Sequence, residues 1–121
     1  MHKLIDANVI LRYILDDIKE QADFAEETIR NGAFTVPEVI AEVVYVLDGV
    51  YKVKRTDTRD VLTSLLEEIS VQEKPIISKA LKLYGEYNLD YVDCILIARF
   101  EMYGEKVVSF DKKLNKYITK T

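Results

Sequence analysis

The residues whose types and spacing could do chemistry are carboxylates. Each one follows a short apolar run or stands in the first turns of an expected helix. In a parallel sheet, strand ends and helix starts meet at one edge, and ligands bind there. We therefore expect these side chains to share a site. The candidates are Asp6, Glu42, Asp90, Asp93 and Asp111.

Carboxylates gathered at one edge need a positive partner. Each close pair repels by up to about 4 kcal/mol at about 4 Å and an effective dielectric of about 20. His2 is the only histidine and Cys94 the only cysteine, so zinc is a poor candidate. All-oxygen ligation suits Mg²⁺ or Mn²⁺. An ion held in this way, with positions left for water and substrate, is suited to phosphoryl chemistry.

Each acid also has a purely structural interpretation. Asp is a favoured helix N-cap, worth about 1 kcal/mol over Ala, which could explain Asp6, Asp90 and Asp111. Glu42 shares a predicted buried stripe with Val39 and Val46, where a carboxylate needs a partner such as a Lys or Arg. The residues alone leave these interpretations open.

In the elements that must position the acids, the spacing of apolar residues alternates between that of a strand and that of a helix. Short apolar runs predict strands, and apolar residues at helical spacing predict the helices between them. The helix after Pro37 is expected to bury Val39, Val43, Val46 and Val50. This alternation is typical of a three-layer α/β/α sandwich with a short central parallel sheet, here one domain over residues 1–121. The strands are expected at 3–5, 34–36, 70–73 and, most clearly, 107–110.

Four segments resemble the PIN domain family, most closely the VapC-type toxins of bacterial and archaeal toxin–antitoxin pairs. Their order and separations make the resemblance specific, and together they cover nearly the whole chain. In the last segment, the hydroxyl residue Ser109 precedes the final acid by two positions, as in the family. The segments are residues 4–11 with Asp6, 37–43 with Glu42, 90–98 with Asp90 and Asp93, and 109–114 with Asp111.

The resemblance implies a Mg²⁺- or Mn²⁺-dependent endoribonuclease that leaves a 5′-phosphate and a 3′-hydroxyl. It implies that Asp6 and Asp93 are the main metal ligands, that Glu42 and Asp111 complete the site, and that Asp90 is a supporting acid. It also implies an RNA substrate, a small antitoxin protein as partner, and a homodimer. The apolar residues available for these protein contacts are Ile14, Phe24, Val50 and Tyr51.

Composition limits the other possibilities. The 121 residues include 17 Lys and Arg against 21 Asp and Glu, a formal net charge of −4, which argues against binding nucleic acid by bulk charge alone. One cysteine, Cys94, predicts a buried thiol and no internal disulfide. The apolar runs are too short for a membrane helix, and the start of the sequence lacks a secretory pattern, so we expect a cytoplasmic protein.

Two basic groups could offset the acidity for RNA. The first follows Tyr51 and is equally well explained as a solvated helix entrance. The second stands beside the last acid, where cations would reduce the repulsion of an incoming phosphate backbone. The groups are Lys52, Lys54, Arg55 and Arg59, and Lys112, Lys113 and Lys116.

Two other functions remain as alternatives. A PIN-like domain could bind RNA or a partner without cutting. A phosphate-accepting receiver module also places acids at strand ends, but it needs two adjacent acids after its first strand, where this chain has only Asp6. That analogy rests on fold alone.

Overall fold

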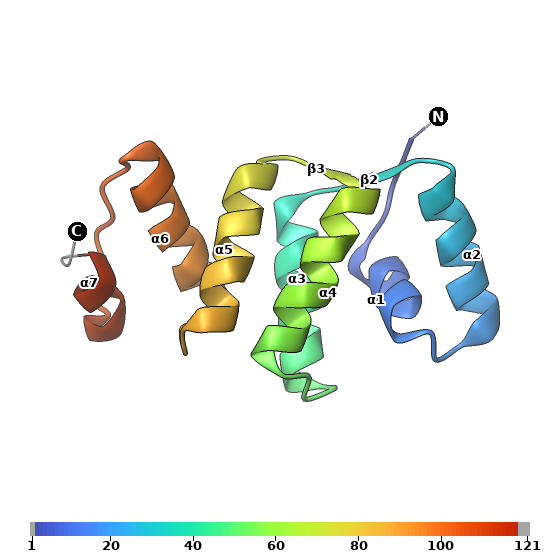
Figure 1. The fold of residues 1–121 in the computed structure, drawn as a ribbon, viewed down its shortest axis with the longest axis horizontal. Helices are drawn as coiled ribbons and strands as arrows, with labels where there is room; N and C mark the ends of the chain where they lie inside the picture. Colours follow the sequence, from blue (N-terminus) through green and yellow to red (C-terminus); the bar gives the residue numbers. More distant parts are fainter. Residues whose placement is uncertain (1, 119–121) are drawn as a thin grey trace.

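The computed structural model describes residues 2–118 (Figure 1); Met1 and residues 119–121, the ends of the predicted domain, lie outside the described residues. Helices and strands alternate as the sequence predicts. Within residues 2–118 they are β1 (Lys3–Leu4), α1 (Ala7–Leu15), α2 (Lys19–Arg30), β2 (Ala33–Thr35), α3 (Pro37–Gly49), α4 (Arg55–Glu68), β3 (Ser70–Val71), α5 (Lys74–Glu86), α6 (Tyr91–Tyr103) and α7 (Lys112–Ile118).

The three strands form one short parallel sheet in the order β1-β2-β3. Leu4 lies opposite Phe34, and Phe34 lies opposite Ser70 on its other side. A helix follows each strand along the chain, which confirms the predicted α/β class with a short parallel sheet. Figure 1 shows α2 at one end of the long axis and α6 and α7 at the other, with α1, α3, α4 and α5 between them.

Local sequence signals explain where the helices begin and end. Pro37 occupies the first turn of α3, where its missing N–H costs nothing. Gly104 ends α6 in the left-handed conformation, at φ +69°. Gly32 precedes β2 at φ +104°, and a Cβ there would stand 2.8 Å from the ring of His2. Only glycine therefore fits this turn without moving the first residues of the chain.

The core of residues 2–118 is aliphatic or aromatic apart from Cys94, Thr35 and Thr58. Cys94 is fully buried in it, as predicted. The predicted stripe of α3 was partly wrong. Val43 is buried, but the rest of the buried face is Ile40, Val44 and Leu47.

The strand expected at 107–110 is not formed. These residues belong to no helix or strand, and Val108 and Phe110 are 93% and 102% exposed. Their β-branched and aromatic composition favours a strand, but a strand also needs a neighbour to accept its hydrogen bonds. Within residues 2–118 no strand pairs with this segment.

Candidate acidic site

Asp6 stands at the end of β1 and caps α1. Its Oδ1 accepts a hydrogen bond from the Val9 backbone N–H at 3.1 Å, and the residue is exposed. The capping interpretation is therefore correct for one carboxylate oxygen. It does not exclude a second role, because a carboxylate has two oxygens and about four acceptor positions.

Asp90 joins the start of α6 to α3. Its Oδ2 accepts from the Val92 backbone N–H at 3.2 Å and from the hydroxyl of Tyr45 at 2.9 Å. Burial and this bond to Asp90 raise the pKa of Tyr45, so its hydroxyl stays a donor. Sequence reasoning missed Tyr45. The available signal was its position three residues after Glu42, which puts both side chains on one face of the helix.

Asp93 lies on α6 like Asp90, and Asp111 adds the start of α7 to this region. Asp93 is half-buried in the first turn of α6. Burial, and after it the negative charges of Asp111 and Asp90, raise the pKa of Asp93. Three carboxylates therefore interact where α6 begins and α7 begins, although 21 positions separate the first and last of them in the sequence.

Asp111 is held in a small hydrogen-bonded turn. Its backbone N–H donates to Ser109 Oγ at 2.9 Å, and its Oδ1 accepts from the Leu114 N–H at 2.9 Å, which caps α7. The carbonyl oxygen of Ser109 accepts from the Asn115 side-chain amide at 2.8 Å. The hydroxyl residue two positions before the last acid thus fixes the backbone that carries the acid.

Glu42 lies exposed on α3, so the prediction that it shares a buried stripe was wrong. Because the carboxylate of Glu42 is exposed to solvent, it needs no Lys or Arg to compensate for burial of its charge. Tyr45, one turn further along α3, reaches Asp90, so this helix passes beside the acids of α6. Asp6, in contrast, opens α1 on the far side of α3 in Figure 1.

The donors do not form a metal site in this arrangement. All the candidate ligands are carboxylates, which is the chemistry that Mg²⁺ and Mn²⁺ prefer. Among residues 2–118, however, no three acidic, histidine or cysteine side chains lie close enough to hold a metal ion. The structure brings Asp90, Asp93 and Asp111 into electrostatic contact but does not bring Asp6 and Glu42 into the same group.

The first predicted basic group is partly structural. The guanidinium of Arg55 lies 3.7 Å from the centre of the Tyr84 ring, and it donates to the carbonyl oxygens of Tyr84 and Leu89. Arg59 pairs with Asp60 at 2.8 Å. Arg55 is therefore committed to joining α4 to the end of α5, and it is not available to grip a phosphate backbone.

The second basic group flanks the acids. Lys113 donates to the carbonyl oxygen of Asn88, which ties the start of α7 to the loop before Asp90. Lys112 and Lys116 are exposed. Two cationic side chains of α7, the helix that Asp111 caps, thus remain exposed.

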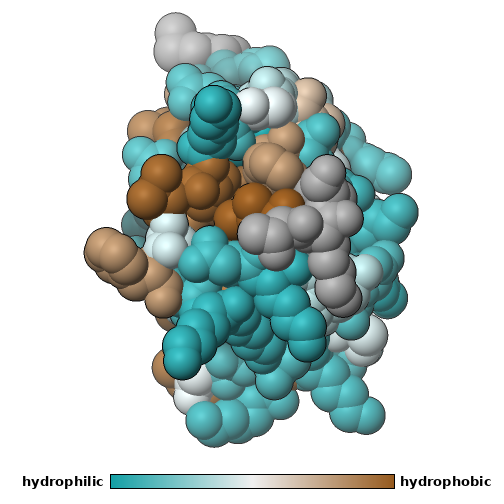
Figure 2. Space-filling view, turned by 90° about the vertical axis from the view of Figure 1, so that its left-hand side faces the viewer, coloured by the Kyte–Doolittle hydropathy of each residue, from teal (hydrophilic) through white to brown (hydrophobic). Residues whose placement is uncertain are grey.

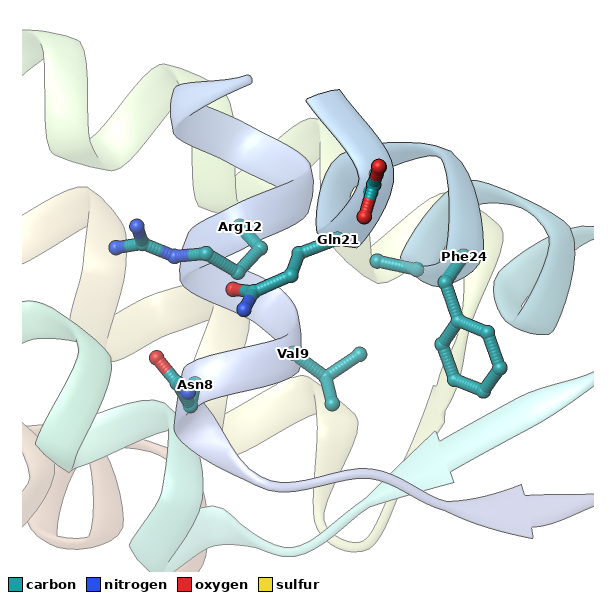
Figure 3. A pocket seen from close by; sticks show the side chains of 7 residues that line it. Asn8, Val9, Arg12, Gln21 and Phe24 are labelled. Atoms are coloured by element: carbon teal, nitrogen blue, oxygen red, sulfur yellow. The ribbon is translucent and has the colours of Figure 1, made fainter. Parts of the chain in front are cut away.

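A hollow of about 350 Å³ lies elsewhere, between α1 and α2. Figure 3 shows Gln21 of α2 reaching toward α1 between Asn8 and Arg12, whereas the guanidinium of Arg12 extends away from Phe24. Arg12 is already engaged, because it donates to Asp17 at 3.0 Å and to the hydroxyl of Tyr51 at 3.0 Å. The hollow lacks the acids of the candidate site.

The short parallel sheet with its surrounding helices agrees with comparison to known proteins. A family model described as PIN domain matches residues 3–119. The chain belongs to the PIN domain family. A curated relative of this PIN domain, the VapC ribonuclease of Aquifex aeolicus (strain VF5), is 33% identical over 127 aligned positions that cover 98% of this chain and 94% of the relative. No solved structure matches significantly.

Membership in the PIN domain family excludes one of the alternative functions, the receiver module. A receiver module is a different fold family, so that interpretation of Asp6 and its neighbours is excluded. No helix within residues 2–118 of this PIN domain has the length and apolar character needed to cross a membrane.

Proposed function

We propose that this PIN domain is an endoribonuclease and the toxin of a toxin–antitoxin pair. The observation that carries the proposal is the meeting of Asp90, Asp93 and Asp111 at the starts of α6 and α7. Repelling carboxylates lower stability, and such groupings persist where they serve a reaction. The relative named a VapC ribonuclease supports RNA as the substrate.

The chain's own residues suit the hydrolysis of a phosphodiester. Water attacks phosphorus, a new P–O bond forms and the bond to the leaving 3′-oxygen breaks, which gives a 5′-phosphate and a 3′-hydroxyl. A carboxylate whose pKa is raised, such as that of Asp93, accepts the water's proton more readily than an ordinary Asp. The turn around Ser109 and the bond from Tyr45 hold Asp111 and Asp90 in place during this step.

We propose Mg²⁺ or Mn²⁺ as the cofactor on the chemistry of the donor set alone, with Asp6, Glu42, Asp93 and Asp111 as ligands. All four are oxygen donors, and no histidine lies among them. Lys112 and Lys116, beside Asp111, are the residues we assign to the RNA backbone. Binding through such contacts weakens as salt rises, and replacing both with Gln is expected to flatten that dependence.

A cleavage assay with purified protein tests the proposal. The wild-type chain should cut single-stranded RNA when Mg²⁺ or Mn²⁺ is supplied and should stop when EDTA removes it. Asp93→Asn and Asp6→Asn should each abolish cutting. Asn also caps helices well, so Asp6→Asn keeps α1 intact, which circular dichroism can verify. Glu67→Gln, an exposed change on α4, is the matched control and should cut like wild type.

The outcomes separate the two remaining functions. Cutting that survives in both Asn variants would indicate a contaminating nuclease and refute the assignment. RNA binding without cutting by the wild-type chain, at any divalent ion concentration, would favour the silent PIN-like domain instead.

We further propose a small antitoxin partner, a homodimer and a cytoplasmic site of action. Exposed apolar residues support the protein contacts, since Phe24 and Val50 are 65% and 68% exposed and Tyr51 is 40% exposed. Ile14, in contrast, is half-buried. Co-expression with the protein encoded directly upstream should yield a complex with reduced RNA cleavage. Independent elution of the two chains would contradict the antitoxin proposal.

A further inference from the structure

The hollow between α1 and α2 has no part in the cleavage reaction described so far. Its volume of about 350 Å³ lies within the range of pockets that hold small organic groups. Its lining combines apolar with polar side chains, among them Val9, Phe24, Asn8, Arg12 and Gln21. A mixed lining of this kind suits a ligand that has both an apolar face and hydrogen-bonding groups.

Three polar groups of this α1–α2 hollow have no hydrogen-bond partner within residues 2–118. The Nε of Arg12 is buried and unbonded there. The side-chain amides of Asn8 and Gln21, both exposed residues, form no hydrogen bond with the described part of the chain either. Figure 3 shows the amide of Gln21 between Asn8 and Arg12, so the three groups share one space. Because buried polar groups in native proteins are nearly always bonded, the free Nε indicates an acceptor that a ligand supplies.

The charges in the α1–α2 hollow favour an uncharged ligand over a phosphate group. The guanidinium of Arg12 is paired with Asp17 at 3.0 Å, and it also donates to the hydroxyl of Tyr51 at 3.0 Å. Glu20 is the other charged residue of the lining, and its carboxylate repels an anion. The lining therefore offers hydrogen bonds without a free positive charge.

A second hollow joins the α1–α2 hollow to Asp6. Its volume is about 270 Å³, and its lining includes Asp6, Val9 and Phe24. Val9 and Phe24 line both hollows, so the two adjoin along these side chains. The backbone N–H of Val9 donates to Asp6 at 3.1 Å, which holds this shared wall next to the acid. A polymer that passes Asp6 can therefore place its next group in the α1–α2 hollow.

The opposite end of the molecule has a different surface. Figure 2 looks onto the α6–α7 end and shows hydrophobic residues gathered across the middle of that face. Exposed apolar residues of α6 and its following segment are Val92, Met102, Tyr103, Val108 and Phe110. A gathered apolar face of this kind is typical of protein contacts. The α1–α2 hollow, at the other end of the long axis in Figure 1, has one exposed ring among polar groups and better suits a nucleic acid base.

We propose that the α1–α2 hollow binds one unpaired base of the RNA, next to the phosphate that lies at Asp6. The inference rests on the proposed function, because it assigns a subsite for the same substrate. Proteins recognise single-stranded RNA by stacking its bases on aromatic rings and by hydrogen bonds to the base edges. Phe24, 65% exposed, stacks on the base. The amides of Asn8 and Gln21 donate to and accept from its edge, and Arg12 Nε donates once Gln21 turns toward the base.

Binding of short RNA in EDTA tests the base site without any cleavage. Four single-stranded ribohexamers that differ only in one central base are titrated at low salt, and fluorescence anisotropy gives their dissociation constants. We expect the wild-type chain to bind one hexamer about 5- to 150-fold more tightly than the weakest, which is the discrimination that one amide pairing with a base provides. Gln21→Leu should make the four dissociation constants equal. Phe24→Ala should weaken binding of the preferred hexamer by about 5- to 150-fold through loss of stacking.

Gln72→Leu is the matched control. Gln72 is exposed like Gln21, but it follows β3 and does not line the α1–α2 hollow. This variant should bind all four hexamers like wild type, and circular dichroism verifies that every variant is folded. In NMR spectra of the wild-type chain, the side-chain amide signals of Asn8 and Gln21 should shift when the preferred hexamer is added. The signal of Gln72 should not shift.

The outcomes separate the base site from the proposed function. Equal dissociation constants for the four hexamers, or no shift of the Asn8 and Gln21 amide signals, would overturn the base site. Variants at Phe24 and Gln21 that keep the hexamer preference but no longer bind the protein encoded directly upstream would assign the hollow to a protein partner, and would overturn it as well. A wild-type chain that discriminates among the hexamers but cuts no RNA in Mg²⁺ or Mn²⁺ would refute the nuclease and leave the base site standing.

Discussion

Removing the hydroxyl of Thr35 tests what holds the backbone of Ile5, the residue before Asp6, against β2. Thr35 is fully buried in β2, and its Oγ1 donates to the backbone carbonyl of Ile5 at 2.8 Å. Thr35→Val keeps the size and β-branching of the side chain but removes the donor. The carbonyl of Ile5 is then left without this partner in a buried setting.

The expected loss follows from the cost of an unsatisfied buried acceptor, which is about 1–3 kcal/mol. For a domain of 121 residues, we expect the melting temperature to fall by about 4 °C for each kcal/mol, hence by about 4–12 °C. Urea unfolding followed by circular dichroism measures the free energy directly. The slope against urea should stay constant, because the unfolded chain exposes the same surface.

Thr28→Val is the matched control. The Thr28 hydroxyl also donates to a backbone carbonyl, that of Phe24 at 2.9 Å, but within one helix and nearer to solvent. Bonds of this kind add little to helix stability, so we expect a change of less than about 0.5 kcal/mol. Equal losses for the two variants would refute the reasoning, since they would show that burial of the carbonyl does not decide the cost.

Two further substitutions test the acids and the link between α4 and α5. Because the folded-state pKa of Asp93 lies above its unfolded value, stability falls as pH rises through that pKa. Asp93→Asn should therefore melt higher than wild type at about pH 7–8, with the gain vanishing below about pH 4, whereas Glu67→Gln should show no such trend. Arg55→Lys loses the planar contact with Tyr84 and one of the two hydrogen bonds to carbonyl oxygens. We therefore expect the free energy of unfolding to fall by about 2 kcal/mol. Arg30→Lys, in an exposed ion pair, should change the free energy of unfolding by less than about 0.5 kcal/mol. A similar loss in the Arg30 and Arg55 variants would contradict the role of Arg55.

The sequence predicted most of the order of elements because their signals are local. Asp6, Pro37 and Gly104 mark helix boundaries through their own backbone chemistry, and the structure places all three as expected. Asp6, Asp90 and Asp111 were found in the same way, because each stands at such a boundary. Which face of α3 is buried depends on its neighbours. Its β-branched residues occur on several sides, so counting apolar positions favoured Val50, which is exposed.

The strand at 107–110 shows the limit of local signals. Val108 and Phe110 have the composition of a strand, but pairing depends on a second segment far away in the sequence. The same reason applies to the site. Residue types predicted a common role for Asp6 and Asp111, whereas the distance between them depends on how distant parts of the chain pack.

The packing of α4, α5 and α6 also bears on how the chain folds. Each of these helices packs on the next one in the sequence, and the pairs α4–α5 and α5–α6 share the most extensive contacts among the helices. Contacts between neighbours in sequence require little loop closure, so they form early. The sheet supplies few ladder hydrogen bonds, since its strands are two or three residues long. Amide protons of α5 and α6 should consequently exchange with solvent more slowly than those of the strands, and the second half of the chain should order before the first.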